Sequence, residues 1–371
     1  MQVPFIDLSR VTQKVSADVH AAWKGCLDRC EFVGGPGVAR VEQNLSKILA
    51  VPRTVSCANG TDALIVGLQA LGVKAGTKVA VPNLTFWATY EAVAVLGAIP
   101  VLVDIDPDDL QLSFDELKKA HEAHRFEAVA LVHLYGWASA RLADIRAFCA
   151  ERNIGLLEDG AQCFGVEVAG EPVLSKATVG TLSFYPAKVI GGAMDGGAIT
   201  LQTAEQEKLV RSLCNHGRAD HYAYAHVGWN SRMGGVQAAF LNAVLELAPE
   251  IVSTRRAAAE RYRERLSSHG KLRVYGPPAG VVENGYLNVF TVQGRGGQEI
   301  VDALKAKGIG AARTYPEPMD AQPPTKGVAI PFGTLEHSRA LCKSVVNLPL
   351  FYGIRDEEIN ASVQALLEIL G

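Results

Sequence analysis

Lys188 lies in a stretch of sequence that could make its amine chemically reactive. It follows the segment SFYPA and precedes a run of glycines, and a strand candidate lies on either side. A lysine amine attacks carbonyl groups when its pKa is lowered, as happens in a desolvated pocket. Most lysines are solvated surface residues, but a neighbouring proline and surrounding glycines are less typical of a surface. Lys188 is therefore a candidate nucleophile.

A pair of carboxylates is predicted at the end of another strand. In the segment LLEDGAQCFG, two leucines bring Glu158 and Asp159 to the strand's C-terminal end. Ligands of open α/β sheets bind at that edge. A carboxylate there can pair with a protonated ring nitrogen, and Gln162 can hydrogen-bond a nearby oxygen. The alternative is an ordinary solvated loop carboxylate, and this segment alone leaves both interpretations open.

The segment NGTDAL follows a strand candidate and opens a helix candidate. Thr61 is predicted as the N-cap of that helix, and Gly60 allows close approach to the backbone. The first N–H groups of a helix have no internal partner and carry the positive end of its dipole, so a phosphate fits there. A plain capped turn is the alternative, and the motif alone favours it.

Two further segments offer possible ligand contacts, but each alone is weaker evidence for a binding site. PNLTFWAT follows a strand candidate and offers Phe86 or Trp87 as a flat face for a planar ring. An aromatic side chain at a strand end more often packs in the core. GWNSRM places Asn230 and Arg232 before a long helix, and by itself it would be a surface loop.

The elements that must position these residues alternate between short apolar runs and helical patterns. Helices are predicted from Asp62, from Ser113 with Glu116 three residues later, and over Leu142–Glu151. This alternation predicts an α/β fold whose mostly parallel sheet has helices on both faces. The strand candidates are Thr54–Ala58, Lys78–Val81, Pro100–Asp104, Ala128–His133, Gly155–Glu158, Gly180–Phe184 and Gly197–Leu201.

The pattern changes after Leu201. A loop rich in His, Tyr, Gly and Asn spans Asn215–Arg232, and a long helix is predicted over about Gly235–Ser267, with Pro249 as a candidate break. We therefore expect a large domain over residues 1–247 and a smaller C-terminal α+β domain over 248–371. The elements expected in the smaller domain are strands Leu272–Tyr275 and Leu287–Val292 and helices Gln298–Lys307 and Asp356–Leu370.

Composition excludes several classes of function. A formal net charge of −3 over 371 residues predicts no binding to nucleic acid or to an anionic membrane. The seven cysteines include no CxxC or Cys/His ligand spacing, so neither a metal site nor a disulfide framework is predicted. The first residues show no signal-peptide pattern, and no apolar run approaches the roughly 20 residues of a membrane span. We expect a cytoplasmic protein.

In their order and spacing, these motifs resemble the DegT/StrS-type sugar aminotransferases, within the fold-type I pyridoxal-phosphate enzymes. The resemblance covers nearly the whole chain, and it is carried by VPFIDL, FVGGPGVARVEQNL, NGTDAL, PNLTFWAT, LVHLYG, EDGAQCFG, SFYPAK, DGGAI, NHGR and GWNSRM. It implies that Lys188 carries pyridoxal 5′-phosphate as a Schiff base and that Asp159 pairs with the pyridinium nitrogen. It implies that Gln162 lies near the phenolic oxygen of the cofactor and that Phe86 stacks on the cofactor's ring.

The same resemblance assigns residues to the cofactor's phosphate. They are Gly60, Thr61 and Ser183 of one chain and Asn230 of the partner subunit. A homodimer with shared active sites is therefore implied.

The resemblance also implies a reaction, in which an amino group moves from L-glutamate to a nucleotide-linked keto sugar in amino-sugar biosynthesis. The sequence pattern SFYPAK…DGGAI is more similar to that of members that aminate C3 of the sugar than to that of members that aminate C4. Thr314 stands before Tyr-Pro where relatives often have His, and Met194 stands before DGG where glycine is common. The departure at Thr314 affects the expected substrate contacts.

Three alternatives stay open at this level. One is a pyridoxal-phosphate-dependent sugar dehydratase; relatives of that kind have His in place of the lysine, whereas Lys188 is present here. Another is a noncatalytic or regulatory protein that retains the fold, since a fold does not fix a function. The third is a nicotinamide-dependent oxidoreductase, which the absence of GxGxxG after the first strand disfavours.

Overall fold

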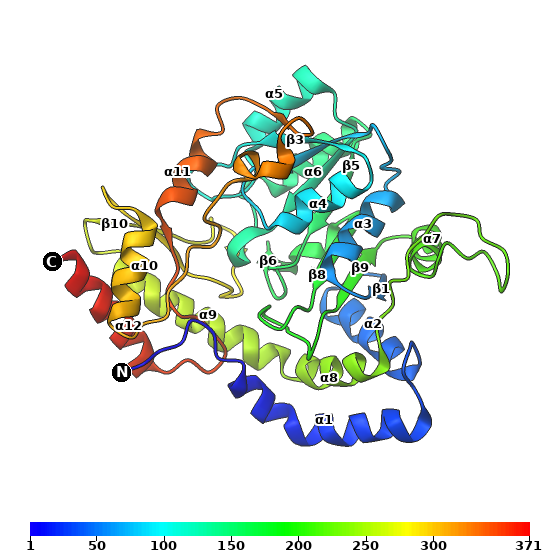
Figure 1. The fold of residues 1–371 in the computed structure, drawn as a ribbon, viewed down its shortest axis with the longest axis horizontal. Coiled ribbons are helices and arrows are strands. Elements are labelled where there is room, and N and C mark those ends of the chain that lie inside the picture. Colours follow the sequence, from blue (N-terminus) through cyan, green and yellow to red (C-terminus); the bar gives the residue numbers. More distant parts are fainter.

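The computed structural model describes residues 1–371, and its centre is one eight-stranded sheet (Figure 1). The strand order is β1-β9-β8-β5-β4-β2-β3-β13. Only β9 runs antiparallel to its neighbours, so the predicted mostly parallel sheet is confirmed. The strands are β1 (Arg53–Cys57), β2 (Lys78–Pro82), β3 (Ile99–Val103), β4 (Ala128–Val132), β5 (Gly155–Asp159), β8 (Val179–Ser183), β9 (Gly197–Leu201) and β13 (Ile330–Pro331).

Helices cover both faces of this sheet, because successive residues of its central strands are apolar and their side chains point to opposite sides. One face packs against α3 (Gly60–Ala70), α4 (Trp87–Val95) and α7 (Ala204–Cys214). The other face packs against a larger apolar core, to which several helices contribute. Among them are α2 (Pro36–Ile48), α5 (Phe114–His124), α6 (Leu142–Glu151) and α8 (Gly235–Glu246).

A second layer of structure lies at the C-terminal end of the chain. A three-stranded antiparallel sheet, β10-β12-β14, packs with three helices around its own core of 23 buried residues. These elements gather at one end of the molecule in Figure 1. They are β10 (Leu272–Tyr275), β12 (Val289–Val292), β14 (Val345–Val346), α9 (Ala248–Leu266), α10 (Gly297–Ala306) and α12 (Asp356–Leu370).

The remaining elements are short, apart from the first helix. A small sheet joins β6 (Glu167–Val168) to β7 (Glu171–Pro172) and β11 (Val281–Val282), and α11 (Glu336–Ser344) precedes β14. The segment between α7 and α8 projects from the end of the molecule opposite the C-terminal helices (Figure 1).

The N-terminal helix α1 (Ser9–Arg29) was not among the predicted elements. It buries only a narrow stripe, Val15, Val19 and Cys26, and packs along α8 (Figure 1). Before it, residues 1–8 cross to the C-terminal layer, where Val3 pairs with Ile309. The N-terminal segment therefore joins the two layers of the protein.

The long helix predicted over Gly235–Ser267 is two helices, and the predicted break at Pro249 is misplaced. The chain bends at Leu247, between α8 and α9, and Pro249 lies in the first turn of α9. Proline is tolerated there because the first-turn N–H groups have no intrahelical acceptor. The proline therefore follows the break.

No single helix of the chain is both long enough and apolar enough to cross a membrane. By length and composition alone, the bent pair of α8 and α9 passes the same test, with an angle of 60° between the two helices.

Candidate active site

A cavity of about 770 Å³ opens beside the edge of the sheet where β5 and β8 end. Such an edge is where ligands of parallel α/β sheets bind. Seven of the eight predicted site residues line this cavity, although they come from four separate parts of the sequence. They are Gly60, Thr61, Phe86, Asp159, Gln162, Ser183 and Lys188.

Lys188 lies in a compact turn that follows β8. Its backbone N–H donates to the carbonyl of Tyr185 at 2.9 Å, and Gly192 N–H reaches back to Phe184 at 2.8 Å. A Cβ at Gly191 would lie only 2.2 Å from the carbonyl oxygen of Pro186, so only glycine fits there. The glycines beside Lys188 therefore permit the turn that brings the amine to the cavity, 5.4 Å from the centre of the Tyr286 ring.

Asp159 is the last residue of β5, and it is 4 % exposed. Thr89 donates to its Oδ2 at 2.9 Å, and the backbone N–H of Ala161 donates to its Oδ1 at 3.1 Å. Burial raises the pKa of Asp159, and the hydrogen bonds from Ala161 and Thr89 oppose that rise. Both donors are neutral, so a cation in the cavity would stabilise this carboxylate.

Glu158, the neighbouring carboxylate, points away from the cavity. Strand side chains alternate between the two faces of a sheet, and Glu158 accepts hydrogen bonds from Arg146 at 2.8 Å and from His133 at 2.9 Å. Although burial opposes it, these hydrogen bonds lower the pKa of Glu158. The two carboxylates predicted at one strand end therefore have different roles. Glu158 forms a structural ion pair, and only Asp159 lines the cavity.

Gln162 is held at both ends of its amide group. Its Oε1 accepts from the backbone N–H of Tyr135 at 2.7 Å, and its Nε2 donates to the hydroxyl of Tyr315 at 2.5 Å. Burial raises the pKa of Tyr315 well above its ordinary value, so this hydroxyl stays protonated at neutral pH. Gln162 is fixed at the cavity wall before any ligand binds.

Phe86 precedes α4 and is 55 % exposed, so its ring is available to a flat ligand. Tyr315 lies beside it, with 6.2 Å between the two ring centres. Sequence reasoning did not identify Tyr315, Tyr286 or Thr89 as cavity or site residues. The departure noted at Thr314 was the one signal pointing to that segment, and Thr314 does line the cavity.

A cradle suited to phosphate lies at the N-terminus of α3, although its predicted N-cap is wrong. Asn59, rather than Thr61, caps the helix, with its Oδ1 accepting from the N–H of Asp62 at 2.8 Å. Asn59 has the extended backbone of an N-cap, whereas Thr61 lies inside the first turn. A Cβ on Gly60 would lie 2.7 Å from the Cβ of Ser183. Glycine therefore keeps this helix start open beside Ser183.

Asn230 does not reach the cavity of its own chain. It is exposed, it pairs with Asn215 across the projecting segment, and its side-chain oxygen accepts a hydrogen bond from Arg232. The same segment carries exposed apolar and aromatic side chains, among them Tyr222 and Val227. A contact between Asn230 and a cofactor would therefore require a second chain.

The cavity residues fit pyridoxal phosphate by their own chemistry. Gly60 leaves open a helix start at which a phosphate can be bound. The buried Asp159 carboxylate has only neutral donors and matches a protonated ring nitrogen. The Lys188 amine and the Phe86 ring supply a carbonyl-reactive nucleophile and a flat apolar surface.

Comparisons with known proteins agree with this chemistry. The model of the DegT/DnrJ/EryC1/StrS aminotransferase family matches residues 13–367. The chain is 35% identical over 322 residues to the UDP-2-acetamido-2-deoxy-3-oxo-D-glucuronate aminotransferase of Pseudomonas aeruginosa, covering 86% of this chain and 88% of that one. It is 33% identical to the UDP-N-acetyl-3-dehydro-alpha-D-glucosamine 3-aminotransferase of Acidithiobacillus ferrooxidans, covering 96% and 95%.

A solved structure shares the fold over the full length of both chains. It is a DegT/DnrJ/EryC1/StrS aminotransferase from Brucella abortus, with a TM-score of 0.94, 31% sequence identity and 100% coverage of each chain. The predicted fold class is confirmed by this similarity. The chain therefore belongs to the DegT/DnrJ/EryC1/StrS aminotransferase family and is a pyridoxal-phosphate-dependent aminotransferase.

Proposed function

We propose that this enzyme transfers an amino group from L-glutamate to the C3 keto group of a nucleotide-linked sugar, in amino-sugar biosynthesis. The observation that carries the proposal is the meeting of Lys188, Asp159 and the Gly60 cradle in one cavity. Relatives named for 3-oxo and 3-dehydro UDP-sugars support the class of acceptor and the carbon that is aminated.

Each of these residues has a distinct task in the proposed reaction. When bound, pyridoxal phosphate supplies the electron sink that stabilises charge at the substrate carbon. Lys188 Nζ takes and returns the proton at that carbon as a general base and acid. Asp159 holds the proton on the ring nitrogen, since its buried carboxylate is stabilised by a positive partner. Gln162 and Phe86 fix the orientation of the ring.

The volume of the cavity is compatible with a cofactor and a substrate bound together. A volume of about 770 Å³ lies at the upper part of the range typical of ligand sites, roughly 300–1,000 Å³. Thr314, in place of the His common in relatives, lines this cavity. It presents a small hydroxyl-bearing side chain to the acceptor instead of an imidazole.

The proposal extends to the architecture of the enzyme. We propose a large cofactor-binding domain over residues 1–247 and a small domain over 248–371, with the division at the bend between α8 and α9 and with β13 returning from the later part of the chain to the edge of the large sheet. We also propose a homodimer in which Asn230 of each chain binds the phosphate in the partner's cavity. The exposed position of Asn230 on the projecting segment supports this arrangement.

Absorbance spectroscopy of the cofactor-loaded enzyme tests the reaction. L-glutamate should shift the visible band of the bound cofactor, and a nucleotide-linked 3-keto sugar should then restore it. The reverse assay offers nucleotide-linked amino sugars with 2-oxoglutarate and measures the glutamate formed. A noncatalytic regulatory protein would show no shift with any amino donor, and a dehydratase would consume sugar without forming glutamate. An aminotransferase for C4 would prefer 4-amino over 3-amino sugars.

A further inference from the structure

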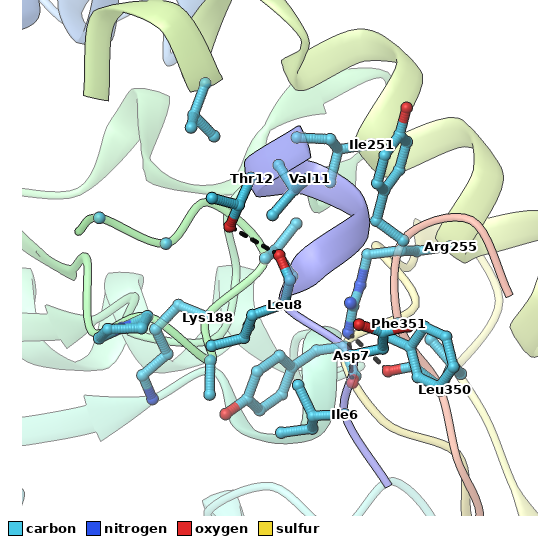
Figure 2. Close-up of a pocket in the computed structure, with 18 of the residues that line it drawn as sticks. Ile6, Asp7, Leu8, Val11, Thr12, Lys188, Ile251, Arg255, Leu350 and Phe351 are labelled. Atoms are coloured by element: carbon cyan, nitrogen blue, oxygen red, sulfur yellow. Dashed lines mark hydrogen bonds between the residues drawn. The ribbon is translucent and has the colours of Figure 1, made fainter. Parts of the chain in front are cut away.

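A second cavity, of about 120 Å³, adjoins the first at Lys188. Ala187, Lys188, Tyr286 and Thr314 line both cavities, so the two cavities adjoin along these residues. The rest of the smaller cavity is mostly apolar. Its walls come from residues 5–12, at the start of α1 and just before it, from the turn around Lys188, from α8 and α9, and from residues 350–352 (Figure 2).

Arg255, on α9, places a buried cation at the wall of this smaller cavity. It is 7 % exposed and makes no ion pair in the chain. Its Nε and Nη2 donate to the carbonyls of Gly285, Tyr286 and Leu350 at 3.0–3.2 Å, whereas Nη1 has no acceptor in the chain. Burial lowers the pKa of Arg255 to about 10, so the guanidinium is still charged at neutral pH.

Asp7 is the one carboxylate that lines the smaller cavity, and other groups already occupy its oxygens. Its Oδ1 accepts from the N–H and the hydroxyl of Ser9 at 3.0 and 2.6 Å, and its Oδ2 accepts from Arg10 at 3.0 Å. A buried charge without a counter-ion is costly. The charge of Arg255 is therefore available to an anion that enters the cavity.

We propose that the smaller cavity binds the distal carboxylate of a dicarboxylic amino donor, with Arg255 as its counter-charge. Figure 2 shows Lys188 and Arg255 on opposite sides of the cavity, with Leu8 between them. A donor whose amino group reacts beside Lys188 would extend its side chain toward Arg255. The apolar walls would pack against its methylene groups, and about 120 Å³ is too small for a nucleotide-linked sugar.

This inference rests on the proposed transamination, and donor selectivity tests it. The half reaction of the cofactor-loaded enzyme is followed by absorbance with L-glutamate and with L-norvaline, which has the same chain length without the distal carboxylate. The ratio of the two kcat/KM values should fall at least about tenfold in Arg255→Gln, because only glutamate loses a charged contact. Arg255→Lys should retain part of the ratio, because it keeps the charge without the planar fork.

A purely structural role of Arg255 predicts a different result. Loss of its three carbonyl contacts would lower the rates with both donors together and leave their ratio unchanged, which would overturn the proposal. Binding of glutarate, a dicarboxylate with no amino group, provides a second readout by calorimetry on the loaded enzyme. It should weaken at least about tenfold in Arg255→Gln.

A pair of variants at Leu8 decides the question even when the Arg255 variants do not fold. Leu8 is partly exposed on the N-terminal segment and lines the smaller cavity. Leu8→Glu places a carboxylate where the donor's is proposed to bind, and Leu8→Gln is the neutral match of the same size. The glutamate-to-norvaline ratio should fall at least about tenfold further in Leu8→Glu than in Leu8→Gln. Equal ratios in the two variants would overturn the proposal.

The wild-type enzyme separates failure of this inference from failure of the proposed function. An enzyme that reacts with L-glutamate and L-norvaline equally well is an aminotransferase without the carboxylate subsite. An enzyme that reacts with no amino donor overturns the proposed function and the subsite with it.

Discussion

At the scale of single residues, the cavity places neutral hydrogen-bond donors beside Asp159 and glycines beside Lys188. Asp159 is buried with Thr89 and Ala161 as its hydrogen-bond donors, and Lys188 lies in a turn that Gly191 makes possible. Both side chains are thereby placed for an aromatic cofactor with a protonated ring nitrogen before it binds. Their substitution should affect chemistry more than folding.

Lys188→Ala should leave the fold intact and lower turnover roughly 10⁴-fold, because the proton transfer and the covalent attachment both depend on its amine. The measurements are steady-state kinetics, the visible spectrum of the bound cofactor and circular dichroism. Lys208→Ala, at an exposed lysine on α7, is the matched control and should match wild type. Near-wild-type turnover in Lys188→Ala would show that another group carries the cofactor.

Asp159→Asn should retain some cofactor but lower kcat at least about 100-fold, because a neutral amide does not hold the ring nitrogen protonated. Kinetics together with a cofactor titration separate the two effects. An unchanged kcat would remove Asp159 from the mechanism.

The cofactor-free form of the same variant should gain stability at neutral pH. The pKa of Asp159 is raised by burial above its ordinary 3.8. The folded state then holds its proton to higher pH than the unfolded chain, and the free energy of unfolding falls as pH rises through that window. Cofactor-free Asp159→Asn should therefore melt above cofactor-free wild type at pH 7, and the gap should close below pH 3.8. A cofactor-free variant that is less stable than wild type at pH 7 would contradict the predicted direction of the stability change.

At the scale of elements, the start of α3 and the end of β8 create the phosphate cradle together. Gly60 opens the helix under the Asn59 cap, and Ser183 ends the strand beside it. Gly60→Val should weaken cofactor binding at least tenfold, about 1.4 kcal/mol, because its side chain would occupy the cradle. Equilibrium dialysis against pyridoxal phosphate measures this.

The matched control for that substitution is Gly270→Val. Gly270 is exposed, and a Cβ there meets no atom within 4 Å. Its cofactor affinity should equal that of wild type. Equal affinities in both valine variants would show that the phosphate is bound elsewhere.

The contact between α1 and α12 should make the stability of the protein depend on pH. Although burial favours the neutral acid, hydrogen bonds from Arg10 and Arg355 lower the pKa of Glu358 from 4.5 to about 2. A depressed folded-state pKa stabilises the protein above the unfolded value and loses that contribution as pH falls through the folded one. Glu358→Gln should therefore melt below wild type at pH 7, and the difference should shrink between pH 4.5 and about 2.

Glu357→Gln is the matched control for the acid experiment. Glu357 is next to Glu358 in the sequence, but its side chain is exposed and makes no ion pair. It should follow wild type across the whole pH range. A Glu358→Gln difference that is constant with pH would mean that the contact depends on packing and not on charge.

At the scale of the whole molecule, the projecting segment between α7 and α8 determines where Asn230 can act. We propose that it acts in the partner's site, which a mixture of Lys188→Ala and Asn230→Asp tests. In a mixed dimer one site carries both changes and the other carries neither. Random exchange makes half of the dimers mixed, so about a quarter of wild-type activity should return. Kinetics after exchange, with dimer composition verified by mass, measure the recovery.

The control mixture combines Lys188→Ala with Asp159→Asn, which both lie in the cavity of their own chain. No mixed dimer of this pair has an intact site, so no activity should return. Verified exchange without recovery in the first mixture would mean that each chain builds its own site.

The sequence by itself determined the chemical residues and the local elements that present them. Lys188 in its glycine run, Asp159 at a strand end and Gly60 at a helix start are recognisable because local rules govern turns, caps and strand alternation. All seven predicted strands of the large sheet are present, with small shifts at their ends. The N-cap and the helix break were misplaced by a few residues, since neighbouring polar residues and prolines satisfy the same local rules.

Only the tertiary structure decided which distant residues share a surface. Strand alternation puts Glu158 and Asp159 on opposite faces, but the packing around β5 decided that Asp159 faces the cavity and Glu158 faces Arg146. The tertiary structure brought Tyr315 to Gln162 and Tyr286 to Lys188, contacts between residues about a hundred or more positions apart. It also buried Arg255 beside a small cavity without a counter-ion. Such contacts depend on how helices and loops pack around the sheet, and no local pattern in the sequence encodes them.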